Sequence, residues 1–168
     1  MTDVEALHDA LQGSRRHLFE SLRGLTEEQF RAPADGSGWS IAVHLGHLLR
    51  CERMLVERSH RALDADEPRI ASTGITNDDD PGLTQHLAVP QIIHGLQASR
   101  RDLEVLLKRA GDSGLDRGIV HQRQGRVTVR AMVEKMAAHE QEHAADVAAL
   151  ARQAARSRPV TIPLSPRS

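Results

Sequence analysis

Two histidines four residues apart are the side chains of this chain whose types and spacing are best suited to chemistry. His139 and His143 lie in the run His-Glu-Gln-Glu-His, within the stretch 129–152, which has a helical period. Positions i and i+4 of a helix project from the same face, one turn apart. Polar groups on a buried face need partners, and two imidazoles at this spacing suit a metal ion. The pair therefore indicates a metal site.

The predicted helix has an apolar stripe, and both histidines fall in it. The stripe follows steps of three and four residues and consists of Met132, Met136, His139, His143, Val147 and Leu150. Such spacing is typical of the face that a helix turns toward a protein core. Glu140 lies one step around the helix from His139. We therefore expect Glu140 off the inward face, as a bystander to the site.

The same run matches H-E-x-x-H, the zinc-protease motif in which the glutamate is the general base. Such enzymes usually take a third ligand, His or Glu, from further along the chain. Here His143 is the last histidine and Glu142 the last glutamate, and Asp146 on the same helix is the one acid that follows. The sequence also shows no evident strand along which a peptide could be aligned. We therefore expect the third ligand upstream and do not favour a protease.

Several upstream side chains are candidates for completing the site, and spacing alone does not choose among them. The candidate histidines are His44, His47, His94 and His121. Cys51 lies one turn beyond His47, so a thiolate ligand is an alternative. A lone cysteine on a helix is more often a small apolar residue, and we favour that interpretation.

Four long helices predict an all-α four-helix bundle. They are expected at 4–24, 41–63, 90–110 and 129–155, from apolar residues at helical period and from capping residues. A short helical turn should follow the capping box at Thr26, and an extended piece is expected around 119–122. Bundles build metal sites from inward side chains on facing helices. The predicted architecture can therefore bring an upstream histidine to His139 and His143.

Two stretches fall outside the predicted helices. Segment 64–83 contains the aspartates 78–80, and we interpret it as a long irregular connection, either a lid or disordered, with its aspartates in solvent. Residues 156–168 contain three prolines and are expected to form a tail. The predicted organisation is thus one bundle domain at 1–155 and a C-terminal tail at 156–168.

Composition limits the partners and the compartment. The 168 residues include 22 basic and 23 acidic ones, with a formal net charge of -1. This balance leaves no electrostatic footprint for nucleic acid or an anionic membrane. One cysteine excludes an intrachain disulfide, and the first residues carry acids where a signal peptide carries bases. With no apolar run near the roughly 20 residues that span a bilayer, we expect a cytoplasmic protein.

A series of short motifs, in order along the chain, carries a family resemblance. The motifs are Trp39-Ser40, His47-Leu48, Glu52, the run 125–129, and the pair His139 and His143. Together they resemble the DinB/YfiT-like superfamily of metal-binding four-helix bundles, over residues 25 to about 150. The resemblance implies one divalent metal on three histidines, which by position are His47, His139 and His143. Trp39 is expected to be an apolar plug at the bundle end.

The resemblance also implies an activity. Three histidines leave a tetrahedral metal with an open position, the pattern of a catalytic site. Zinc or nickel is favoured, and iron and manganese also accept three imidazoles. Family members with known activity are mostly transferases of a low-molecular-weight thiol, such as bacillithiol or mycothiol. We therefore expect a small thiol and a small electrophile as partners, in detoxification or stress response.

Alternatives stay open at the level of sequence. The chain could be a non-enzymatic metal-binding stress protein of the same fold, and exposed apolar stripes could form a homodimer. His44 could support a ligand, replace one, or merely pack. Asp146 or Glu142 could orient a ligand imidazole. Three arginines could pair with cosubstrate carboxylates, although we favour solvated charges: Arg50, Arg123 and Arg126.

Overall fold

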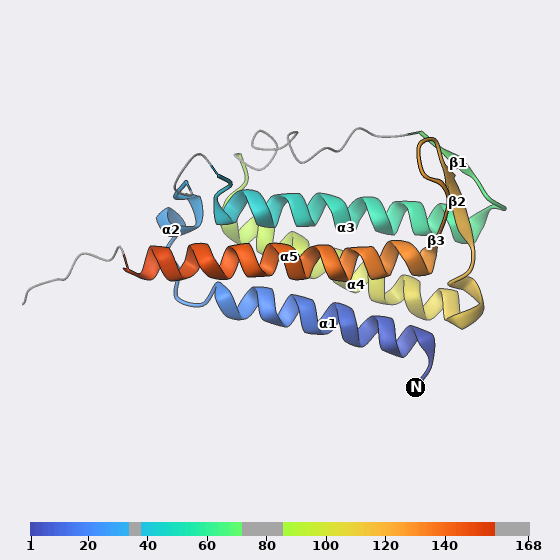
Figure 1. The fold of residues 1–168 in the computed structure, drawn as a ribbon, viewed down its shortest axis with the longest axis horizontal. Helices are drawn as coiled ribbons and strands as arrows, with labels where there is room; N and C mark the ends of the chain where they lie inside the picture. The colour runs from blue at the N-terminus through green and yellow to red at the C-terminus, as the bar shows by residue number, and fades with distance from the viewer. Residues whose placement is uncertain (34–37, 72–85, 157–168) are drawn as a thin grey trace, which may run out of the picture.

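Four long helices lie alongside one another and form the bundle (Figure 1). The computed structural model describes residues 1–33, 38–71 and 86–156. The long helices are α1 (Asp3–Ser21), α3 (Ile41–Asp64), α4 (Val89–Gly114) and α5 (Val129–Arg156), and α2 (Glu27–Arg31) is a short turn. The predicted all-α four-helix bundle is therefore confirmed, with helix boundaries close to those expected.

Side chains at the helix starts pair the backbone N–H groups that a helix leaves without internal partners. The Glu5 N–H donates to Thr2 Oγ1, and the Thr2 N–H donates to the Glu5 carboxylate. Thr26 forms the predicted capping box of α2. Ser40 accepts from the Val43 N–H at the start of α3. These caps explain why the helices begin where the sequence predicts.

A small three-stranded sheet lies at one end of the bundle (Figure 1). Its strands are β1 (Arg69–Ile70), β2 (Gly118–His121) and β3 (Gly125–Thr128). β2 is central, pairing parallel with β1 and antiparallel with β3. The extended piece expected around 119–122 is β2. The expectation of no evident strand is wrong, because β1, β2 and β3 pair into a sheet, and a lack of strands therefore does not exclude a protease.

The segment expected to be irregular is described only in part. Within 64–83, the chain completes α3 and then forms β1. The aspartates 78–80 lie outside the described residues, as do residues 157–168 of the expected tail. None of the helices in the described ranges is long and apolar enough to cross a membrane. Large apolar side chains that are mostly exposed in these ranges are Met1 and Val105, so the homodimer stays a prediction.

Aliphatic side chains fill the space between the helices. The largest fully buried ones are Leu11, Leu18, Ile41, Leu45, Leu48, Ile92, Leu96, Leu103, Leu106, Leu107, Leu115 and Ile119. Burying one such side chain contributes about 1.5–3 kcal/mol. The core therefore needs no aromatic cluster, which agrees with the scarcity of aromatic residues in the sequence.

The inward face of α5 is centred differently from the predicted stripe. Its buried residues are Val129, Val133, Met136, Ala137, Glu140, Ala144 and Val147. His139 and His143 are half-buried at the edge of this face. Glu140 has an exposed fraction of 0%, so its assignment to the outside of the bundle is wrong. The small residues Ala137 and Ala144 belong to the core, and they widen the inward face enough to include Glu140.

Candidate functional site

Four imidazole rings meet between α3 and α5. His44 and His47 come from α3, and His139 and His143 come from α5. The two Nε2 atoms of His47 and His139 are 3.0 Å apart, and the two Nδ1 atoms of His44 and His143 are 2.7 Å apart. Ring centroids of His139 and His143 are separated by 4.4 Å. The structure thus gathers the three predicted ligands, with His44 as a fourth ring, and their role as ligands stays a prediction.

Two groups of potential ligand atoms occur in the described parts of the chain, each with its atoms within 4.8 Å of one another. One group is His47, Cys51 and His139, and the other is His44, His143 and Asp146. By these distances, His143 associates with His44 and an acid. Cys51, and not His143, lies in the group with His47 and His139. The cluster therefore offers more donors than the three histidines predicted from the resemblance.

The spacing of the first group fits a tetrahedral metal ion. Metal bonds of about 2.0–2.1 Å to nitrogen and about 2.3 Å to sulfur place two nitrogens about 3.3 Å apart and a nitrogen and a sulfur about 3.6 Å apart. The two Nε2 atoms of His47 and His139 are 3.0 Å apart, and Cys51 Sγ is 3.5 Å from His47 Nε2 and 4.0 Å from His139 Nε2. Cys51 is thus placed as a ligand would be, which favours the thiolate alternative.

Burial favours the neutral form of His44, His139 and His143, which is the form that metal binding requires. It lowers the pKa of His44 against an opposing effect of Asp146, and it lowers the pKa of His139 against an opposing effect of Glu142. The pKa of His143 falls to about 3, first because of burial and then because of the neighbouring histidines. Unprotonated nitrogens are therefore available at neutral pH.

Trp39 packs against the cluster from the start of α3. Its ring is nearly parallel to that of His143, with an interplanar angle of 6° and centroids 5.9 Å apart. The centroid distances to His44 and His47 are 5.4 and 5.0 Å. An indole N–H only donates hydrogen bonds, so Trp39 is a packing partner of the imidazoles, which agrees with its expected role as an apolar plug.

A pocket of about 300 Å³ adjoins the His47, Cys51 and His139 group. Residues of α3, α5 and the sheet line it, and its wall is mostly apolar. Arg58 and Lys135 are the basic side chains of this wall. No Asp or Glu occurs among its described lining residues. A volume of this size is at the lower end of the range for small-molecule sites.

Four buried charged residues, one from each long helix, form an ion network next to the histidine cluster. Arg15 of α1 contacts Glu140 at 2.5 Å and Glu52 at 3.0 Å. Arg100 of α4 contacts Glu52 at 2.6 Å and Glu140 at 2.8 Å. The Ser14 and Ser99 hydroxyls also donate to these carboxylates. Each carboxylate is thus held by two guanidinium groups and one hydroxyl.

The ion network fixes the two helices that carry the candidate ligands. Glu52 follows Cys51 on α3, and Glu140 follows His139 on α5. Because both glutamates bind the same two arginines, α3 and α5 cannot slide past each other without breaking these contacts. The network therefore positions the histidine cluster.

The ionisation and burial of Glu140 determine whether it can act as the general base of a zinc protease. Burial raises its pKa, but Arg15, Arg100 and the Ser14 hydrogen bond outweigh that effect and lower it overall. Glu140 is therefore a carboxylate committed to a structural network, with an exposed fraction of 0%. A general base needs access to water or substrate. The H-E-x-x-H run of this chain does not have the geometry of a zinc protease.

The remaining sequence candidates are distributed around the molecule. His94 is exposed on α4, away from the gathered histidines, whereas His121 lines the pocket. Glu142 lies 3.9 Å from His139 Nδ1, which is beyond hydrogen-bond distance, so its role in orienting that imidazole stays a prediction. Arg126 pairs with Glu67 at 2.5 Å, so it is a structural charge of the sheet region.

Sequence reasoning missed Arg15 and Arg100, the two cations of the ion network. A signal existed, because Arg15 lies four residues after Leu11 and three before Leu18 on the apolar period of α1. Arg100 lies between Leu96 and Leu103 in the same way on α4. A basic residue at a core position predicts a buried acidic partner.

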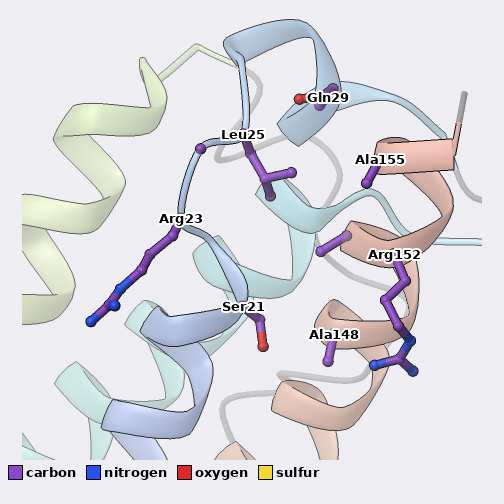
Figure 2. A pocket seen from close by; sticks show the side chains of 9 residues that line it. Ser21, Arg23, Leu25, Gln29, Ala148, Arg152 and Ala155 are labelled. Carbon is purple, nitrogen blue, oxygen red and sulfur yellow. The ribbon is translucent and has the colours of Figure 1, made fainter. Parts of the chain in front are cut away.

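A second cavity, of about 450 Å³, lies between the end of α1, α2 and the end of α5 (Figure 2). Figure 2 shows the guanidinium groups of Arg23 and Arg152 on opposite sides of it. Among the described lining residues there is no His, Cys, Asp or Glu. The described lining residues therefore include no member of the histidine cluster and no group suited to metal binding or acid–base chemistry.

Facing helices that gather imidazole, thiol and carboxylate ligands define a metal-binding helical bundle. A family model described as the DinB superfamily matches residues 10–147, and the chain belongs to this superfamily.

Two known proteins show the extent of the similarity. "Putative metal-dependent hydrolase OB0413" of Oceanobacillus iheyensis is 24% identical over 150 residues, covering 86% of this chain and 84% of that protein. A solved structure is described as "YfiT from Bacillus subtilis is a probable metal-dependent hydrolase with an unusual four-helix bundle topology". It matches with a TM-score of 0.77 and 18% identity, over 89% of this chain and 86% of that chain. The structural match confirms the fold.

Proposed function

We propose that the protein is a metal-dependent enzyme that transfers a low-molecular-weight thiol to small electrophiles. The observation that supports this most is the placement of the His47, Cys51 and His139 group beside a pocket without a carboxylate among its described lining residues. His47, His139 and His143 would hold one divalent ion, zinc or nickel by preference, and would leave a fourth position for the thiol. Cys51 would occupy that position when no thiol is bound.

The chemistry needs few groups from the protein. A divalent ion held by these residues would lower the pKa of a coordinated thiol, so that the thiolate would be present at neutral pH. The sulfur forms a bond to the electrophilic carbon, and the bond from that carbon to a halide or an epoxide oxygen breaks with its electron pair. The thiol proton passes to the epoxide oxygen, or to water when halide leaves. No nucleophilic serine or cysteine of the chain is required.

His121 can assist at the oxygen that develops when an epoxide opens. Its Nδ1 accepts the backbone N–H groups of Arg123 and Gln124, at 3.2 and 3.3 Å. The neutral ring therefore carries its proton on Nε2 and donates from there. Because His121 lines the pocket, this N–H is placed to donate a hydrogen bond to a bound substrate.

Hydrolysis is the second candidate, because the two similar proteins are described as putative or probable metal-dependent hydrolases. A hydrolase commonly uses a carboxylate or imidazole as base for its water. Glu140 is committed to Arg15 and Arg100. Asp146 is exposed and associates with His44 and His143, on the other side of the cluster from the pocket group. These placements suit transfer of a thiol better than attack by water.

The test combines elemental analysis with an assay of thiol consumption. We expect about one divalent ion per chain and metal-dependent consumption of a bacterial thiol with an epoxide or a nitro-activated aryl chloride. His139→Ala should lose the metal and the turnover, whereas His94→Ala, on the surface of α4, should keep both. Full metal retention by His139→Ala would rule out the proposed metal site. Metal-dependent ester cleavage without thiol turnover would establish the hydrolase instead.

A further inference from the structure

We propose that the pocket beside the histidine cluster is a site for a small organic anion, held at its acidic end by Arg58 and Lys135 and along its apolar body by methionines. This deepens the proposed function and rests on it for the reaction of the bound molecule. The recognition of the anion itself depends only on side chains of the pocket.

The positive side chains of the pocket come from opposite walls. Arg58 belongs to α3 and Lys135 to α5, with His121 of β2 as a third polar group. The charges of Arg58, Lys135 and the nearby Arg123 all act on His121, adding to burial in lowering its pKa. Cations from two helices therefore favour the neutral form of one imidazole, whose Nδ1 is an acceptor and whose Nε2 carries the N–H donor.

The charge of Lys135 has no acidic partner among the residues that the structure describes. In the described parts of the chain, no carboxylate lies within 4 Å of its ammonium group. No Asp or Glu occurs among the residues described for the pocket wall. An anionic group that enters therefore meets positive side chains from both helices and no carboxylate among the described residues of the wall. Charge-assisted hydrogen bonds of this type are about twice as strong as neutral ones.

The rest of the wall suits an apolar body. Met54 of α3 and Met132 and Met136 of α5 contribute three of the four methionines of the chain to this pocket. Methionine side chains are flexible and polarizable, so they adapt to ligands of different shape. The expected ligand is thus an aliphatic or aromatic acid, and several related acids should bind.

Positions along the helices set the length of the ligand. Lys135 lies four residues before His139, about 6 Å along α5, and Arg58 lies seven residues after Cys51, about 10 Å along α3. The acidic group and the reactive group of a substrate are therefore separated by roughly 6–10 Å. An unbranched acid of about six carbons, or an aromatic acid of similar length, spans this distance.

The direct test compares hexanoate with its uncharged analogue hexanamide by calorimetry, on metal-loaded and metal-stripped protein. Hexanoate should bind about tenfold more tightly than hexanamide in both forms. Lys135→Gln and Arg58→Gln should each reduce this preference at least threefold. Lys108→Gln, which removes the other lysine of the chain from the exposed surface of α4, should leave it unchanged.

Equal binding of hexanoate and hexanamide to the metal-stripped protein would overturn the proposal, as would absence of binding by either. So would an unchanged preference in both pocket variants. The metal-stripped form is decisive because a carboxylate can itself coordinate a metal. Thermal melting of the two variants establishes that they are folded, since both exchanges remove a charge at a pocket rim without removing core volume.

A thiol-bearing pair of ligands separates this proposal from the proposed function. On metal-loaded protein, 6-mercaptohexanoate should bind more tightly than 6-mercaptohexanol and also more tightly than hexanoate. If only the anion site is absent, the two thiols bind alike. If only the metal-bound thiol is absent, 6-mercaptohexanoate binds no more tightly than hexanoate, and hexanoate keeps its preference over hexanamide.

Discussion

Replacing Glu140 by glutamine tests whether this residue serves the fold or the reaction. In the folded protein its carboxylate contacts Arg15 at 2.5 Å and Arg100 at 2.8 Å, and it accepts the Ser14 hydroxyl. The amide keeps the shape of the side chain, but it removes the negative charge and places an NH₂ group against guanidinium donors. Two buried arginines then share the single carboxylate of Glu52.

The magnitude follows from the burial of the network. Each of the four side chains is at most 7% exposed, and breaking a buried pair by removing one partner costs about 3–5 kcal/mol. We expect Glu140→Gln to lose about 3–4 kcal/mol of unfolding free energy. For a domain of this length the corresponding fall in Tm is on the order of 10 °C.

Chemical denaturation followed by circular dichroism measures this change, with Glu142→Gln as the matched control two residues away. The Glu142 side chain is 79% exposed, so its variant should stay within about 0.5 kcal/mol of the parent. A double variant in which Arg15 and Glu140 both become methionine should recover part of the loss, because it restores charge balance around Glu52 and Arg100. An undiminished stability of Glu140→Gln together with complete loss of turnover would refute the reasoning and restore Glu140 as a general base.

Three further predictions concern the site and the sheet. In the cobalt-loaded protein without added thiol, Cys51→Ser should abolish a near-ultraviolet thiolate-to-metal charge-transfer band; a band of equal intensity in the variant would exclude Cys51 as a ligand. The metal-free protein should lose stability as the pH falls from about 6.5 toward 3, because the unfolded state then binds a proton that His143, with its pKa lowered to about 3, does not take up. Solvent screening of this half-buried ring keeps the slope below about 1.4 kcal/mol per pH unit, and a variant with alanine at 143 should show a shallower dependence of the denaturation midpoint on pH. Gly118→Ala should destabilise the protein by about 1–3 kcal/mol, because a Cβ there would lie 2.7 Å from the Val127 carbonyl oxygen in the sheet. Gly13→Ala, on a helix with open space around it, should stabilise the protein by up to about 1 kcal/mol. Equal denaturation midpoints for these two variants would contradict the packing described for β2.

The helical architecture could be predicted because each long helix carries its own signals. Ser40 and Thr26 act as caps at the positions where the helices begin. Gly111, expected to end the third long helix, has a φ of 58° and a ψ of 179° and interrupts the helical geometry there. Such signals are local and readable from a few neighbouring residues.

The orientation of α5 was harder to predict. Periodicity locates an apolar face but not its centre when small residues share it. Met132 and Leu150 are large and fall in the predicted apolar stripe, yet both are only partly buried. Ala137 and Ala144 are buried and shift the centre of the face toward Glu140. The side of a helix that a charged residue occupies therefore depended on partners from two other helices.

The candidate site was predictable in its histidines and not in its surroundings. The i, i+4 spacing of His139 and His143 is a local feature, and the family resemblance supplied His47. The approach of Cys51 to His139 depends on how α3 and α5 pack. The basic pocket wall depends further on where the sheet places His121. Neither arrangement has a signature in sequence spacing alone.

The ion network has a consequence for how the protein can be handled and redesigned. Its charges hold α3 and α5 together through Arg15 and Arg100, next to the histidines but through other side chains. We therefore expect the bundle to stay folded when a metal ion is removed, unlike small zinc domains that unfold without their metal. One preparation should then accept different ions in turn without refolding. The donors of the cluster can also be exchanged one at a time in a scaffold that keeps its shape, which makes this bundle a starting point for metal centres of other composition.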